Sequence, residues 1–316
     1  MRLAGKDIDY NDPDLEQSIA KAIKLADQHG LIDLADLPEP WKINHSILRG
    51  YRFTNTKRDT AMSFFHLSNE SFNIWSHALG VILVILFSIF LFPQASFQGQ
   101  RGAVDVYVAG LYISAAAVCL LCSVVWHTAK STADLKSMSA FASVDMMGIS
   151  LIVTASMVVT QYAAFYTQPF WQCVYMIPSL LGGLIGLVLP WTSLFRRHDL
   201  ALIKIDTSRL PVTRRWIRVL FFGMLCLQGF VLPSIHMMCA EGLSAAAEFY
   251  RPLMRIFTPI AIGAAIYAAR FPESQLPGWF DYLGGSHNLW HVAVLIGVLR
   301  GFGAIAEMYA LAWRRS

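Results

Sequence analysis

Seven long apolar stretches, separated by short polar segments, occupy the chain after residue 73. They fall at residues 76–98, 104–127, 138–165, 170–194, 216–238, 253–269 and 286–312. A helix of roughly 20 residues crosses the hydrocarbon core of a bilayer, which is about 30 Å thick. The pattern therefore predicts an all-α membrane protein built as a bundle of seven transmembrane helices.

Residues 1–73 have a different pattern. Leu15, Ile19, Ala22, Ile23 and Ala26 recur at helical spacing, and the helix they predict has Asp12 as N-cap and Gly30 after its end. Residues 61–75 mix phenylalanines with polar residues, as is typical of a helix that lies along a membrane surface. We therefore divide the chain into an N-terminal arm with amphipathic and interfacial helices (1–73) and a seven-transmembrane domain (74–316).

Composition also indicates a membrane protein. The chain of 316 residues is 55% hydrophobic and 15% charged, whereas soluble domains carry about 25% charged residues. The net charge is +4, and the basic residues are spread over several loops. This distribution suits membrane orientation and argues against nucleic acid as a partner.

Lysine and arginine predict the orientation of the bundle. Nine precede the first span, two lie between the second and third spans, and six lie between the fourth and fifth. The alternate connections hold only Arg101, Arg251 and Arg255, although Arg314 and Arg315 at the C-terminus weigh the other way. The positive-inside rule places the N-terminus in the cytoplasm and the C-terminus outside. G-protein-coupled receptors have the opposite orientation.

Four ionisable side chains fall inside the predicted spans at one depth. His127 ends the second span, Asp145 lies about two turns into the third, and His287 and His291 begin the seventh, one helical turn apart. On the predicted topology all four face the cytoplasmic half of the membrane. Intramembrane ionisable residues mark functional sites, and three imidazoles with a carboxylate suit Zn²⁺ with a bound water.

The roles within this set remain partly open. Ser123 precedes His127 by one turn and is expected to hydrogen-bond the bound water, the substrate or a group behind the ligands. Asp145 either binds the metal directly or holds its water and acts as general base. Asn288 follows His287 where a zincin protease would have glutamate, so the zincin interpretation fails.

Four other ionisable residues are expected to lie outside the site. His77, beside Trp75, suits interfacial packing, and His236 falls near the outer end of the fifth span. Arg300 is an unusual charge within the seventh span, and Glu307, seven residues further on, is expected to help neutralise it.

Five sequence stretches carry a family resemblance. They are "GYRF" (50–53), "NESFNIWSHALG" (69–80), "SVVWH" (123–127), "SVDMMGIS" (143–150) and "FPESQLPGWFDYLGGSHNLWH" (271–291). In order and placement they resemble the progestin and adipoQ receptor family, also called haemolysin III-like, and its fungal adiponectin-receptor-like branch. The first residues, up to about Lys42, match weakly.

The resemblance implies seven helices and an intramembrane zinc near the cytoplasmic face. It assigns His127, His287 and His291 as ligands and Asp145 as a ligand through water. Alkaline ceramidases of the wider superfamily share this pattern, including a serine that Ser123 matches, and adiponectin receptors are linked to ceramidase activity.

Two functions follow as expectations. The first is a zinc-dependent hydrolase that acts on a lipid amide such as ceramide, with a membrane lipid or sphingolipid as substrate. The alternative is a non-catalytic receptor with a structural zinc and an extracellular protein ligand. A lytic pore is a weaker third, because no regular polar stripe runs through the spans. The plasma membrane and the endoplasmic reticulum both fit, and the oligomeric state stays open.

Overall fold

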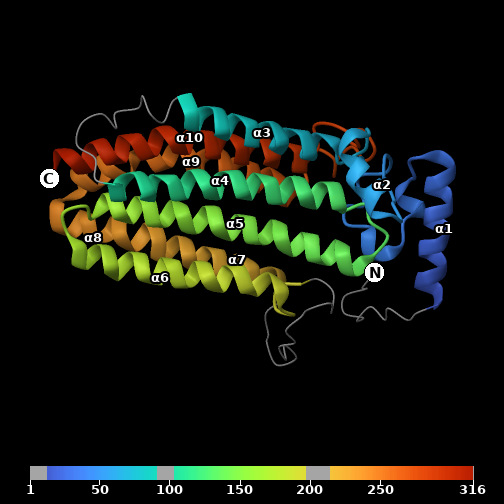
Figure 1. The fold of residues 1–316 in the computed structure, drawn as a ribbon, viewed down its shortest axis with the longest axis horizontal. Helices are drawn as coiled ribbons and strands as arrows, with labels where there is room; N and C mark the ends of the chain where they lie inside the picture. The colour runs from blue at the N-terminus through green and yellow to red at the C-terminus, as the bar shows by residue number, and fades with distance from the viewer. Residues whose placement is uncertain (1–12, 91–102, 197–213, 316) are drawn as a thin grey trace.

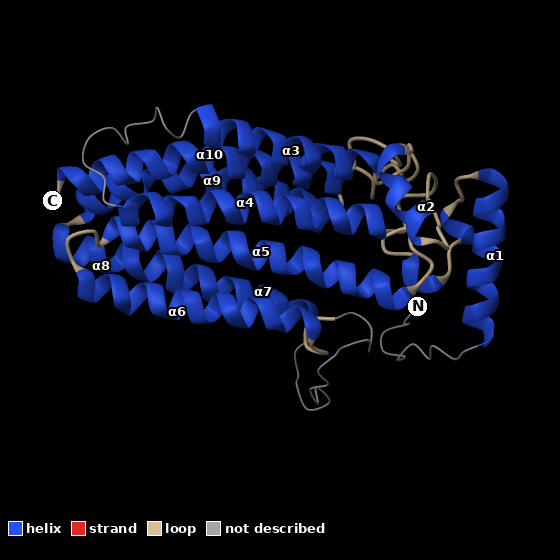
Figure 2. Cartoon of the chain, in the orientation of Figure 1, coloured by secondary structure: helices blue, strands red, loops and turns tan. Residues whose placement is uncertain are grey.

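The computed structural model describes residues 13–90, 103–196 and 214–315, and most of them lie in helices (Figure 1, Figure 2). The N-terminal part contains α1 (Pro13–His29), η1 (Leu34–Asp36), η2 (Glu39–Trp41), α2 (Lys57–Met62) and η3 (Ser63–Phe65). The bundle contains α3 (Ser71–Phe90), α4 (Ala103–Ala129), α5 (Leu135–Ala164), α6 (Pro169–Val188), η4 (Leu189–Trp191), α7 (Arg214–Cys226), η5 (Leu227–Val231), α8 (Leu232–Glu241), α9 (Leu243–Ala269) and α10 (Ser286–Arg314).

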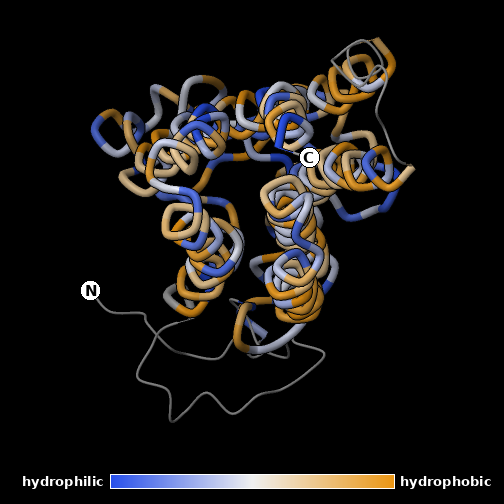
Figure 3. The backbone as a smooth tube through the Cα atoms, turned by 90° about the vertical axis from the view of Figure 1, so that its left-hand side faces the viewer, coloured by the Kyte–Doolittle hydropathy of each residue, from blue (hydrophilic) through white to orange (hydrophobic). Residues whose placement is uncertain are grey.

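These elements form seven spans, each long and apolar enough to cross a membrane, so the predicted bundle is confirmed. The α7–η5–α8 run makes one of them, and its π turn directly precedes α8, whose second residue is Pro233. Figure 3 looks along the bundle and shows hydrophobic residues, in orange, on the helices seen end-on. The main difference is at α9, which begins at Leu243 although the sequence predicted a start at residue 253. Arg251 and Arg255 therefore lie inside this helix.

The N-terminal arm packs against one end of the bundle. Apolar side chains of α1, among them Ala22 and Ala26, form a buried cluster with Trp41, Leu135 and Met138. Trp41 Nε1 also donates a hydrogen bond to the carbonyl oxygen of residue 132, at 3.0 Å. We call this end, where α1 and α2 lie, the arm end (Figure 1). The predicted N-cap Asp12 lies outside the described residues, whereas α1 ends before Gly30 as expected.

The predicted interfacial helix over residues 61–75 is wrong in one respect: the segment is broken. α2 and η3 end at Phe65, and α3 begins at Ser71. In the gap, Ser71 Oγ accepts a hydrogen bond from the Ser68 backbone N–H at 2.8 Å and donates one to the His66 carbonyl at 3.1 Å. These local bonds compete with helical ones and turn the chain. As a result, Glu70 lies directly before the first turn of α3, beside the end of α4.

A close contact between α4 and α5 positions Asp145. At Gly148 of α5, an added Cβ would lie 3.0 Å from the Cα of Cys119 and from the Cβ of Cys122, both on α4. Small residues of this kind let membrane helices approach closely. Asp145 lies one turn before Gly148, and it is therefore held beside α4.

The expected pairing of Arg300 with Glu307 is wrong. Glu307 instead pairs with Arg255 of the neighbouring α9, with 2.6 Å between Nη2 and Oε2. Arg300 donates only to the backbone oxygen of Arg255, at 3.4 Å. Seven residues make about two helical turns, or roughly 10 Å of rise, so a partner on the adjacent helix reaches Glu307 more easily.

Two glycines of α10 provide a matched test of this packing. A Cβ at Gly301 would lie 1.8 Å from Tyr112 Oη, whereas a Cβ at Gly303 has no atom within 4 Å. Tyr112 is buried and donates to the Val298 carbonyl, at 2.8 Å. We expect Gly301→Ala to lower unfolding free energy by about 1–3 kcal/mol, because it overpacks the core. Gly303→Ala should be neutral, and equal losses in thermal unfolding would contradict the packing described.

Candidate metal centre

Three histidines from two helices meet at the arm end of the bundle. His127 lies in the last turn of α4, and His287 and His291 lie in the first two turns of α10. His127 Nε2 is 3.3 Å from His287 Nε2 and 3.1 Å from His291 Nε2. The ligand atoms of the three all lie within 4.8 Å of one another. His127 and His287 are 160 residues apart in the chain, yet their Nε2 atoms face each other.

Hydrogen bonds on the opposite ring nitrogens fix two of these rings. His127 Nδ1 lies 2.7 Å from Glu70 Oε2, and a carboxylate there can only accept. The proton therefore sits on Nδ1 and leaves the Nε2 lone pair free for a metal. His291 Nδ1 lies 3.4 Å from Ser76 Oγ, which itself donates to the Asn73 carbonyl. That arrangement favours the same tautomer for His291.

The spacing of these nitrogens fits a tetrahedral metal. Zn–N bonds of about 2.0–2.1 Å at a tetrahedral angle separate two ligand nitrogens by roughly 3.3 Å. The measured separations are 3.1 and 3.3 Å. The three imidazoles are close enough together to hold a metal ion.

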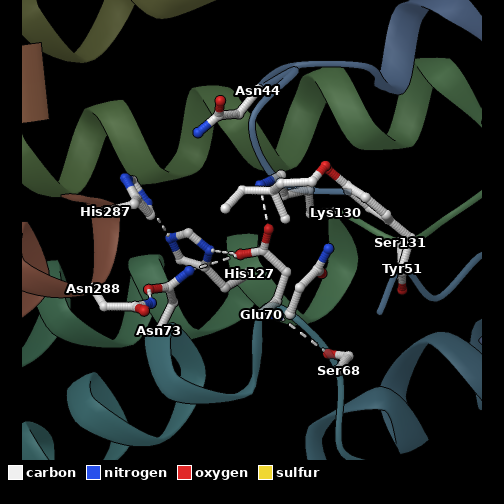
Figure 4. A network of polar contacts seen from close by, with 12 residues as sticks. Asn44, Tyr51, Ser68, Glu70, Asn73, His127, Lys130, Ser131, His287 and Asn288 are labelled. Carbon is white, nitrogen blue, oxygen red and sulfur yellow. Dashed lines mark hydrogen bonds and ion pairs between the residues drawn. The ribbon is translucent and has the colours of Figure 1, made fainter. Parts of the chain in front are cut away.

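Glu70 connects the metal-binding histidines to a wider network (Figure 4). Its Oε1 pairs with the Lys130 ammonium, and its Oε2 accepts from Asn73 Nδ2 at 2.9 Å as well as from His127. Burial by itself raises the pKa of Glu70, but Lys130 and the His127 hydrogen bond together outweigh it and hold the pKa well below its usual range. Glu70 is therefore ionised at neutral pH and acts as an acceptor towards all three partners.

The same network reaches the start of α10. Asn288 Nδ2 donates to Asn73 Oδ1 at 2.8 Å, and Asn288 Oδ1 accepts from the Gly285 backbone N–H at 3.1 Å. Asn288, which stands where a zincin protease would have glutamate, thus caps the start of α10 and bonds to α3. Because it lies between His287 and His291 in the sequence, it fixes the helical turn that carries both.

A second carboxylate ties the start of α10 to the N-terminal arm. Glu273 is buried and accepts from the Ser286 backbone N–H at 2.7 Å, from the Ser286 hydroxyl and from Asn44 Nδ2 at 3.2 Å. A negative charge at a helix N-terminus is stabilised by the orphan N–H groups and by the helix dipole. The arm, the α9–α10 connection and the metal-binding turn are thereby joined at one point.

The two predicted catalytic residues lie next to this cluster. Asp145 on α5 is half-buried and within electrostatic reach of His127, but its carboxylate is not among the ligand atoms of the cluster. Ser123 is buried on α4, one turn before His127. The arrangement suits a carboxylate that acts near a metal without binding it directly.

The remaining histidines of the spans do not join the cluster. His77 is buried rather than interfacial, and it stacks on His291 with ring centroids 3.9 Å apart. Neither of its ring nitrogens has a hydrogen-bond partner among the described residues. His236 lies on α8 against Trp171 and Tyr175, outside the group. Packing was expected for His77, but the buried position was not.

Comparison with known proteins decides the family. The sequence profile described as haemolysin-III related matches residues 65–301, which is most of the chain and includes Glu70 and all three histidines. The chain belongs to the haemolysin-III-related family. This assignment confirms the resemblance drawn from the five stretches, and it makes the chain an integral, multi-pass membrane protein.

Several named relatives of this haemolysin-III-related chain are receptors. The ADIPOR-like receptor IZH3 of Saccharomyces cerevisiae is 29% identical, over 88% of this chain and 59% of its own length. Progestin and adipoQ receptor family member 3 of Mus musculus is 28% identical, over 82% and 80%. An uncharacterized protein of Schizosaccharomyces pombe is 32% identical, over 90% and 61%. The chain thus spans about three fifths of the length of the two fungal relatives.

Glu70, Asn73 and Lys130 are parts of the site that the sequence patterns did not predict. Glu70, Asn73 and His77 stand at i, i+3 and i+7, so they share one face of a helix. In this haemolysin-III-related chain that face is turned towards α4 and α10, as the bonds to His127 and Asn288 show. The spacing was a usable signal, but the predicted first span began only at residue 76.

Replacement of one ligand tests the cluster. His127→Ala removes the ring nitrogen that the other two histidines face, so we expect it to lower bound metal severalfold. His236→Ala is the matched control, because its ring packs against aromatic side chains at the other end of the bundle. Elemental analysis of the purified proteins measures both, and an equal loss of metal from the two variants would refute the site.

Glu70→Gln tests the residue behind the cluster. The variant keeps the size of the side chain but removes the charge that His127 Nδ1–H and Lys130 face, so metal affinity should fall by roughly 10- to 100-fold. Glu39→Gln, on the exposed arm, is the control. Titration against a chelator of known affinity gives both values. Unchanged affinity in Glu70→Gln would show that Glu70 does not orient His127.

Proposed function

We propose that the chain is a zinc-dependent hydrolase that cleaves the amide bond of a membrane lipid of the ceramide type. The observation that carries this proposal is the ligand set: three imidazoles converge, and the nearby carboxylate of Asp145 stays outside the group. Catalytic zinc sites commonly have three protein ligands and an open fourth position, whereas structural sites are closed by four.

The donor chemistry favours zinc as the metal. Neutral imidazoles suit Zn²⁺, whereas Mg²⁺ and Ca²⁺ prefer oxygen ligands. When bound, Zn²⁺ acts as a Lewis acid that polarises a carbonyl oxygen and activates water for attack. A small cavity on the arm side, lined in part by Glu70, His127 and Lys130, has room for a water molecule beside this region.

In this proposal Asp145 moves the proton. Its carboxylate accepts a proton as the water oxygen bonds to the amide carbon, and it returns that proton to the nitrogen as the C–N bond breaks. The products are a carboxylic acid and an amine, so atoms and charge balance. Ser123, one turn deeper on α4, is placed to hydrogen-bond the substrate or the attacking water.

The depth of the site supports a lipid substrate. His291 stands five residues after Ser286, which is about 8 Å from the start of α10. The amide of a ceramide-type lipid lies just below the bilayer surface, at a comparable depth. A substrate that diffuses within the membrane therefore brings its scissile bond to the level of the histidines.

The alternative is a receptor whose zinc is structural. The names of relatives from yeast and from Drosophila melanogaster, an ADIPOR-like receptor and an adiponectin receptor protein, support it. A metal that joins α4 to α10 would then stabilise the bundle, and an extracellular protein would be the ligand. This alternative expects a protein that binds zinc, unfolds on chelation and never turns over a lipid amide.

Asp145→Asn separates the two functions. We expect it to retain zinc and to lose turnover of a short-chain fluorescent ceramide by about 10²–10⁴-fold, because the amide cannot accept the proton. Asp134→Asn is the matched control on α5: it is the N-cap, and asparagine caps equally well. Zinc-loaded wild type with no turnover above empty vesicles, or full turnover in Asp145→Asn, would contradict the mechanism.

A further inference from the structure

Two arginines stand at the middle of membrane-spanning helices. Arg300 is 14 residues from Ser286 and 14 from Arg314, the two ends of α10 (300 − 286 and 314 − 300). Arg255 is 12 and 14 residues from the ends of α9 (255 − 243 and 269 − 255). At 1.5 Å per residue, each lies roughly 20 Å from either end of its helix. The Cα atoms of both arginines therefore lie near the centre of the bilayer.

Among the described residues, Glu307 is the carboxylate that forms ion pairs with these arginines. Glu307 pairs with Arg255 at 2.6 Å and with Arg251 at 3.7 Å. Arg300 reaches the Arg255 backbone oxygen, and within the part of the chain that the structure describes no carboxylate lies within ion-pair distance of it. Three guanidinium groups against one carboxylate leave a net charge of +2 on what we call the basic face, formed by Arg251, Arg255, Arg300 and Glu307.

The basic face lies on the outside of the bundle. The side chains of Arg251 and Arg255 are 70% and 50% exposed, and Arg300 is also exposed. Large apolar side chains surround them on the same two helices: Met254, Ile262, Leu289, Val292 and Ile296 are exposed as well. Such an apolar surface faces lipid, where an unneutralised charge is costly and where charged residues pair or contact water.

We propose that the basic face docks a transmembrane helix of another protein, which carries an aspartate or glutamate near the middle of its span. The charge decides the sign of the partner, because a carboxylate at this depth removes part of the net charge of +2. Gly303 lies one turn from Arg300, and a Cβ added there would have no atom within 4 Å, so a helix has room to approach.

Depth and charge disfavour two other occupants. A second copy would oppose one basic face with another and would add like charges at close range. The headgroups of anionic lipids lie about 15 Å from the bilayer centre. Arginine side chains snorkel towards the nearer interface, and Glu307, seven residues from Arg314, draws Arg255 and Arg251 towards that end of the bundle. The bond to the Arg255 backbone oxygen holds Arg300 near mid-depth, and Arg300 has no ion pair among the described residues.

The test uses a synthetic helix as the probe. The full chain, labelled with a fluorescent donor, is reconstituted in phosphatidylcholine vesicles with an acceptor-labelled leucine-rich transmembrane peptide. The peptide carries either glutamate or its neutral isostere glutamine at its centre. We expect energy transfer to show about tenfold tighter binding of the glutamate peptide, as for a charge-assisted hydrogen bond. Equal binding of the two peptides would overturn the proposal.

Variants of the chain locate the contact. Arg300→Leu should remove most of the preference for the glutamate peptide, and Arg300→Lys should retain part of it. Arg314→Leu, at the exposed end of the same helix, should leave the preference intact. Circular dichroism confirms the helical fold of each variant. Arg300→Glu should in turn prefer a peptide with a central lysine, and this reversal cannot arise from a loss of folding.

The remaining outcomes identify the other occupants. Energy transfer between two labelled copies that Arg300→Leu abolishes would replace the proposal with self-association. If phosphatidylglycerol in the vesicles displaces the glutamate peptide, the face would be assigned to an anionic lipid. Either result would contradict a partner helix as the occupant.

Discussion

The hydrogen bond between Glu70 and His127 holds the metal centre together. It joins the residue directly before the first span to the last turn of the second, and it fixes which nitrogen of His127 is free. The other two histidines face that nitrogen. A proton on Nε2 of His127 would therefore block the lone pair at the point where the three rings meet. Lys130 and Asn73 hold Glu70 in turn, so the carboxylate has little freedom to choose another partner.

The rest of the arm end of the bundle is arranged around this contact. α10 contributes two histidines, and its first turn is held from two sides: by Asn288 bonded to α3 and by Glu273 bonded to Ser286 and the arm. The arm therefore contributes to the geometry of the metal centre without supplying a ligand.

Local sequence patterns were sufficient for the bundle and for the histidine cluster. Hydropathy alone located all seven spans, and a comparison of depths brought His127 together with His287 and His291. The same reasoning could not find the bond between Glu70 and His127, which are 57 residues apart, or the one between Asn44 and Glu273, which are 229 apart. Periodicity reports which face of a helix is apolar, but it does not report which side chains meet across two helices.

Charge misled the prediction where charged residues lie inside a helix. Arg251 and Arg255 suggested a boundary, and the predicted span began between them at residue 253, but α9 already begins at Leu243 and continues through both. Glu307 was assigned to Arg300 on the basis of one helix, whereas the neighbouring helix supplies the actual partner. The start of the sixth span was misplaced because arginine was taken as a sign of a helix boundary, although it lies within the helix here.

X-ray absorption at the zinc edge, on protein purified without chelators, is the decisive experiment for the metal centre. We expect a metal with three imidazole nitrogens at about 2.0–2.1 Å and a light oxygen scatterer in the remaining position. A spectrum with sulfur neighbours, or with fewer than three imidazoles, would contradict the three-histidine site. So would a folded protein that fails to take up zinc when zinc is added.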